Sequence, residues 1–112
     1  MKIMFVHQNM PGQYRELVQW LADQRTHQIY FLTQRKNPPR FDGVETRVYK
    51  AHHRPAENAY GLSKNWEEST GNGLGAARAA KQIETREGFK PDIVVGHVGW
   101  GELTFFKQIW PD

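Results

Sequence analysis

Two short segments, His7–Gly12 and His97–Gly101, each begin with a histidine, contain glycine and follow an apolar run. Imidazole titrates near neutral pH, so either histidine could transfer a proton or hydrogen-bond a substrate hydroxyl. Glycine permits positive φ and lets backbone N–H groups come close to a ligand. Each segment also leads toward an expected helix N-terminus, which favours an anion such as a phosphate. Together the segments predict a ligand site.

The elements that would position these segments follow from the spacing of apolar residues. Short apolar or β-rich runs predict four strands, at Ile3–Val6, Gln28–Thr33, Val44–Tyr49 and Ile93–Val95. A stripe with spacings of three and four predicts a helix after the first strand, with Tyr14, Leu17, Val18, Leu21 and Ala22 facing the core. Two further helices are expected at 63–87 and 101–110, with Ser63 as N-cap, Gly88 as stop and Glu102 in a first turn.

This alternation of strands and helices predicts an α/β fold, a Rossmann-like three-layer domain with a mostly parallel four-stranded sheet. Right-handed crossovers give the expected strand order 3-2-1-4, in which strands one and four are neighbours. The chain reverses direction between those two strands, so the segments His7–Gly12 and His97–Gly101 should face each other across a crevice.

Composition limits the classes of protein that the chain can represent. It has 112 residues, a formal net charge of +3, 12% aromatic residues and no cysteine. Those values favour one folded domain and exclude disulfide scaffolds, zinc–thiolate sites and cysteine nucleophiles. The sequence has no apolar run of the roughly 20 residues that a membrane span needs. We therefore expect a cytoplasmic location, with peripheral membrane attachment left open for a longer protein.

Three other patterns are weaker signals of function. Gly71–Ala76 formally fits the dinucleotide fingerprint G-x-G-x-x-A, but a polar stretch precedes it where a strand is required, so close helix packing with a break near the glycines is favoured. His52 and His53 are adjacent and would point apart on an extended chain, which makes a poor metal chelate. The basic segment Gln34–Arg54 raises nucleic-acid binding as a minor hypothesis, but the net charge is modest and we expect no nucleic-acid partner.

The two histidine segments resemble a known family when they are read together. The opening MKIMFVHQNMPGQYR and the later PDIVVGHVGWGELTFFK, which starts at Pro91, are similar to the N-terminal domain of family 4 glycosyltransferases, retaining enzymes of the GT-B architecture. The similarity runs over nearly the whole chain and is strongest at its two ends. Residues 1–112 would then be a truncated, partial N-terminal domain that supplies the acceptor side of the cleft.

The resemblance implies a sugar transfer from a nucleotide-diphosphate donor, with no metal and no further cofactor. It puts Gly12 beside the donor diphosphate and His97 at the transferred sugar as the catalytic residue. We expect further substrate contacts from residues of the same two segments: His7, Gln13, Gly99, Trp100 and Glu102.

The resemblance also predicts what the chain lacks. The donor-binding C-terminal domain would be a missing partner, so we expect the chain alone to be inactive, because transfer needs donor and acceptor held together. The fourth strand would expose unpaired backbone groups, which predicts self-association through the sheet edge. The alternative hypothesis is a stand-alone flavodoxin-like module that binds a nucleotide or phosphate between the two loops.

Overall fold

A computed structural model shows that the chain folds as layers of helices around a parallel sheet. The order of the strands in that sheet confirms the predicted topology. The structure describes residues 1–51, 61–97 and 101–111. Its four strands are all parallel and lie in the order β3-β2-β1-β4. They span β1 Lys2–Val6, β2 Gln28–Thr33, β3 Val44–Val48 and β4 Ile93–Gly96. The predicted neighbours β1 and β4 therefore pair directly, with Ile3 beside Ile93.

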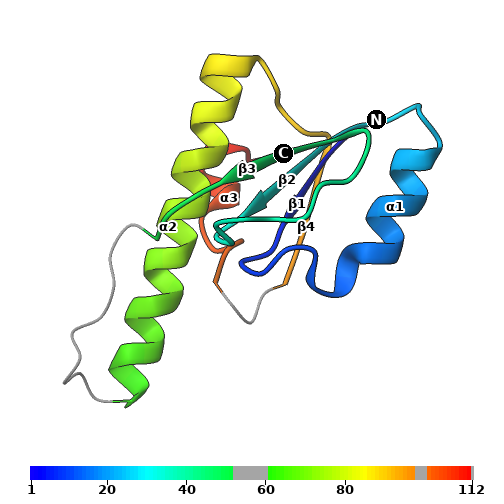
Figure 1. The fold of residues 1–112 in the computed structure, drawn as a ribbon. Coiled ribbons are helices and arrows are strands. Elements are labelled where there is room, and N and C mark those ends of the chain that lie inside the picture. The colour runs from blue at the N-terminus through cyan, green and yellow to red at the C-terminus, as the bar shows by residue number, and fades with distance from the viewer. Residues whose placement is uncertain (52–60, 98–100, 112) are drawn as a thin grey trace.

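Helices cover the sheet on both sides and complete three layers. They are the 3-10 turn η1 Gly12–Tyr14 and the α-helices α1 Arg15–Asp23, α2 Gly61–Glu87 and α3 Phe106–Ile109. Helix α1 lies on one side of the sheet, and α2 and α3 lie on the other (Figure 1). Alternate residues of β1 enter the two cores: Phe5 packs with Val18 on the α1 side, and Met4 packs with Ala80 on the α2 side. The central strand is therefore buried on both faces.

The buried stripe of α1 is narrower than the spacing predicted. Tyr14, Val18 and Ala22 are buried and Leu21 is half-buried, but Leu17 is 44% exposed, so its assignment to the core was wrong. Because α1 starts only after η1, positions four apart from Tyr14 face the sheet and Leu17 falls on the flank.

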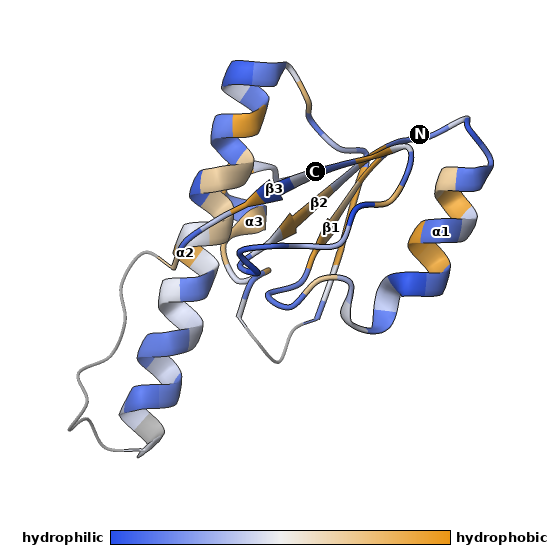
Figure 2. Ribbon diagram, in the orientation of Figure 1, coloured by the Kyte–Doolittle hydropathy of each residue, from blue (hydrophilic) through white to orange (hydrophobic). Residues whose placement is uncertain are grey.

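Helix α2 runs unbroken from Gly61 to Glu87, so the predicted break near the glycines is absent and Ser63 lies inside the helix instead of capping it. Its N-terminal half extends beyond the sheet and is mostly hydrophilic (Figures 1 and 2). The small residues do allow close packing, as expected: a Cβ on Gly73 would lie 2.6 Å from the carbonyl oxygen of Gly101. The stop at Gly88, with φ of 71°, is also confirmed.

The predicted helix at 101–110 shrinks to the four residues of α3. Gly101 has a φ of 84°, outside the helical region, and the segment that follows forms turns closed by bonds such as Thr104 N–H to the Gly101 carbonyl. Glu102 therefore does not lie in the first turn of a helix. It is fully buried in the turn before α3.

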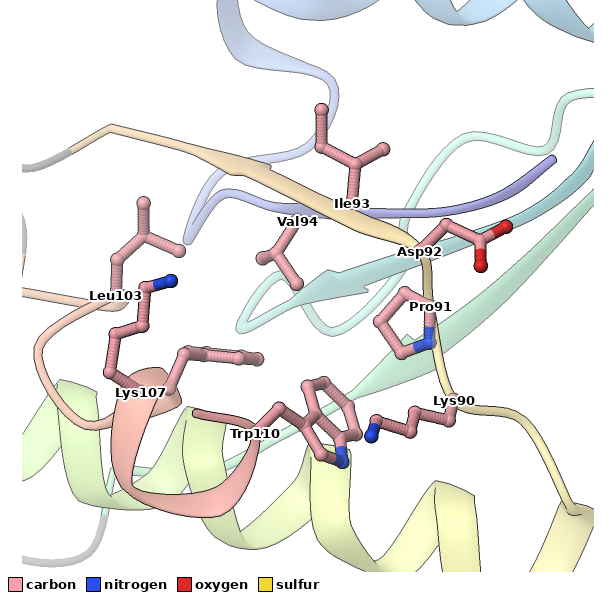
Figure 3. A pocket seen from close by; sticks show the side chains of 9 residues that line it. Lys90, Pro91, Asp92, Ile93, Val94, Leu103, Lys107 and Trp110 are labelled. Atoms are coloured by element: carbon pink, nitrogen blue, oxygen red, sulfur yellow. The ribbon is translucent and has the colours of Figure 1, made fainter. Parts of the chain in front are cut away.

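The two edges of the sheet differ in chemistry. On β3, Arg47 is bonded to Glu87 at 2.6 Å and contacts Glu45, so that edge carries paired charges. Strand β4 has only apolar residues and glycine, and Ile93 is 48% exposed. A cavity of about 360 Å³ opens beside β4, between Val94 and α3, with Ile93 pointing to the opposite side of the strand (Figure 3). Charged edges resist added strands, whereas apolar edges accept them.

The packing of α2 predicts the effect of adding one methyl group. Gly73→Ala should lower the free energy of unfolding by about 1–3 kcal/mol, because the new Cβ meets backbone that cannot move aside, despite the better helix propensity of alanine. Gly61→Ala is the matched control, since nothing lies within 4 Å of its added Cβ. Denaturant unfolding measures both, and equal effects of the two substitutions would contradict the packing.

The apolar β4 edge keeps self-association as a prediction. Light scattering at high concentration should show dimers or larger species, and Ile93→Lys should return the chain to monomers by charging that edge. Val48→Lys is the control, because Val48 is 50% exposed on the other edge strand and its substitution should leave association unchanged. A strictly monomeric wild-type chain would overturn the prediction.

Candidate functional site

The loops that follow β1 and β4 meet at the carboxyl edge of the sheet. A hydrogen bond of 3.0 Å joins the Gln8 N–H of the first loop to Glu102 Oε1 of the second region, although 94 positions separate the two residues. His97 lies close enough to His7 for its charge to lower the pKa of the His7 imidazole. The structure thus brings His7, Gly12, Glu102 and His97 to one edge, where ligands of open α/β sheets bind.

Side chains hold three successive N–H groups of the first loop. Gln8 N–H donates to Glu102, Asn9 N–H donates to His7 Nδ1 at 3.0 Å, and Met10 N–H donates to Thr33 Oγ1 at 3.2 Å. The acceptors come from the turn before α3, from the end of β1 and from the end of β2. The loop is therefore fixed from both neighbouring strands, which is the preorganisation that a binding loop needs.

The carbonyl groups of the same loop are held from the β2 side. Gln8 O accepts hydrogen bonds from Thr33 Oγ1 at 3.1 Å and Gln34 N–H at 3.2 Å, and Met10 O accepts from Arg35 Nη1 at 2.7 Å. Sequence reasoning missed the roles of Thr33 and Arg35. The available signal was a polar, β-branched residue ending the otherwise apolar part of β2.

His7 and Gly12 pack directly on each other. Gly12 has a φ of 56°, and a Cβ at that position would lie 2.5 Å from His7 Nε2, so only glycine fits over the ring. Because Nδ1 accepts the Asn9 N–H, the neutral imidazole carries its proton on Nε2, the nitrogen next to Gly12. The ring also meets Tyr14 edge-on, at 5.9 Å between centroids.

Burial sets the protonation of the two groups that hold the loop. Desolvation, and secondarily the charge of His97, lowers the pKa of the His7 imidazole. Burial raises the pKa of the Glu102 carboxyl, and its own backbone N–H, the Gln8 N–H and His97 offset part of that increase. His7 is thereby favoured as the neutral ring that the Asn9 bond requires.

The groups that a ligand could reach lie beside this fixed core. Gly12 and Gln13 are exposed and His97 is half-buried. The N–H groups of Gly12 and Gln13 begin a helical segment, where backbone donors have no partner within the helix. A second, partly buried group of hydrogen bonds starts from Gln34, the residue after β2. Gln34 Nε2 donates to Asn72 Oδ1 at 2.7 Å and to Tyr49 OH at 3.2 Å.

Some predicted positions fall elsewhere. Gly99 and Trp100 lie outside the described residues, as do His52 and His53. The cavity of Figure 3 lies toward the amino end of β4, with Asp92 and Trp110 in its lining, and is therefore separate from the histidines. Within residues 1–51, 61–97 and 101–111, no three His, Asp or Glu side chains gather to hold a metal ion.

The parallel sheet, with two histidine loops at its carboxyl edge, defines a Rossmann-like ligand-binding domain. The chain matches the Glycosyl transferase family 4 group over residues 25–112, and it belongs to that family. No curated protein and no solved structure matches it. The match includes His97 and Glu102, and the first loop, which holds His7 and Gly12, precedes it in the chain.

Among residues 1–51, 61–97 and 101–111, no helix is both long and apolar enough to cross a bilayer.

The proximity of the two histidines gives a direct electrostatic prediction. His97→Ala should raise the pKa of His7 toward 6.5, because it removes the positive charge that adds to the effect of burial. NMR titration of the His7 ring measures the change. His27→Ala is the control, since His27 lies just before β2 at the opposite end of the strands. An unchanged His7 titration in His97→Ala would contradict the closeness of the two histidines.

Proposed function

We propose that the chain forms the acceptor-side wall of a sugar-transfer site, which a donor-binding domain completes. The observation that carries this proposal is the fixed first loop, in which exposed Gly12 lies on His7 and His97 lies near that ring, within a chain of the Glycosyl transferase family 4 group. The reaction is transfer of a sugar from a nucleotide-diphosphate donor to an acceptor, in a GT-B enzyme that retains anomeric configuration.

Each residue has a role that its surroundings support. Gly12 and Gln13 are exposed residues at a helix start, and their N–H groups would approach the donor diphosphate, because a helix start favours phosphate oxygens. His97 would hydrogen-bond the transferred sugar. His7 would hold Gly12 in place and present its Nε2 proton beside the loop. Gly99 and Trp100 would add substrate contacts.

The fixed loop also weakens the alternative of a stand-alone phosphate-binding module. Such a module would use the loop N–H groups to cradle phosphate, but protein acceptors already occupy those of Gln8, Asn9 and Met10. The N–H groups of Gly12 and Gln13 are then the hydrogen-bond donors that this loop can offer to phosphate. Two such groups suit one part of a larger site for the nucleotide-diphosphate sugar. We therefore propose that the chain needs its donor-binding partner domain for activity. We also propose that the protein acts in the cytoplasm.

Sugar transfer in a protein that joins this chain to its donor-binding domain tests the proposal. His97→Ala should reduce turnover by at least about tenfold, the loss of one well-placed hydrogen bond in the transition state. His27→Ala should leave turnover unchanged, since His27 lies away from the carboxyl edge of the sheet. Release of the nucleoside diphosphate from activated sugars is the readout. Equal turnover in the two variants would remove His97 from the mechanism.

A further inference from the structure

We propose that Glu102 is a positioning residue, whose buried carboxylate locks the loop after β1 against the turn before α3 and never touches substrate. The side chain is fully buried, so no ligand reaches it in this arrangement. Its one hydrogen bond to another residue, among those described, goes to the Gln8 N–H, the first of the three held N–H groups. Glu102 acts on the site through that bond.

The burial of Glu102 is costly, which separates it from an ordinary packing residue. Oε1 has the Gln8 partner, but Oε2 is buried and has no hydrogen-bond partner within the described part of the chain. A buried carboxylate with incomplete partners destabilises a fold. A glutamine of the same shape would keep the bond to Gln8 without the charge.

The Glu102 carboxylate interacts electrostatically with residues from several elements. Glu102 contributes to the raised pKa of Tyr14, next to α1, and of Tyr49, just after β3, where burial is the main cause for both. His97 is the positive partner that offsets part of the burial cost of Glu102. The carboxylate is therefore near enough to Tyr14, Tyr49 and His97 to interact with them electrostatically, while its hydrogen bond to Gln8 fixes the first loop.

The pH dependence of stability has a defined sign for such a group. The folded-state pKa of Glu102 is raised, so folding favours its protonated form. The associated stability is fully present below the unfolded value, near 4.5, and is lost as pH rises through the folded pKa. Glu102→Gln should remove this loss and unfold at equal or higher denaturant concentration than wild type at neutral pH.

Amide hydrogen exchange in this chain tests the positioning role. Glu102→Ala should speed exchange at the Gln8 amide by at least about tenfold relative to amides of β1 and β2, because it removes the acceptor. Glu102→Gln should restore protection, since its carbonyl oxygen can accept the same bond. Thr33→Val is the comparison variant: it removes the acceptor of the Met10 amide and the donor to the Gln8 carbonyl, but leaves the Gln8 N–H its Glu102 acceptor, so exchange should rise more at Met10 than at Gln8.

Each exchange result decides the proposal. Local release of Gln8 with rescue by glutamine supports it. Unchanged exchange at Gln8, or a uniform rise at all amides, overturns it. If Glu102→Ala fails to fold, the folded Glu102→Gln variant still decides, because a fall in its neutral-pH stability would show that the charge itself stabilises the fold.

A second readout rests on the proposed function and can fail separately. Inorganic pyrophosphate, titrated into a protein that joins this chain to its donor-binding domain, should shift the Gly12 and Gln13 amide signals, and Glu102→Ala should weaken that binding by about fivefold or more. Binding that is equal in the two proteins would overturn positioning for a ligand. If pyrophosphate shifts neither amide in wild type, the proposed diphosphate site fails, while the exchange data still decide the role of Glu102.

Discussion

The hydrogen bond between the Gln8 N–H and the Glu102 carboxylate closes the carboxyl edge of the sheet. It joins two loops that are far apart in sequence, and the rest of the site depends on where it holds the first one. The Asn9 N–H then donates to His7 Nδ1 and the Met10 N–H donates to Thr33 Oγ1. The chain can next turn at Gly12, which packs over the His7 imidazole. A shift of this bond would move every group that the proposed donor site uses.

The sheet makes this bond possible. Strand β1 lies between β2 and β4 and is buried on both faces, so its end and the end of β4 are held side by side. All strands are parallel, which sends both loops to one edge. The close approach of α2, allowed by Gly73, brings the Gly101 turn toward the same edge and with it Glu102. The packing of α2 against the Gly101 turn thus helps to position the site.

The sequence predicted the fold better than the site. Continuous apolar runs such as Ile3–Val6 are typical of buried strands and can be recognised from the sequence alone. Once strands alternate with helices, the connection rules leave few allowed strand orders. Glu102 was expected in a helix because local propensity favours it there. Its burial depends on Gln8, a tertiary contact that no local pattern contains. The role of Thr33 was missed for the same reason, whereas Leu17 was misplaced by an unforeseen 3-10 turn.

The central claim is the proposal that the loops after β1 and β4 form one wall of a sugar-transfer site, which a donor-binding domain completes. NMR titration of a protein that joins this chain to its donor-binding domain, with uridine, guanosine and adenosine diphosphate sugars, tests it most directly. We expect one of these donors to shift the amide signals of Gly12 and His97 together, with the same saturation curve, because both belong to one site. Shifts confined to one loop, or to the basic segment around Arg40 and Arg47, would contradict the claim.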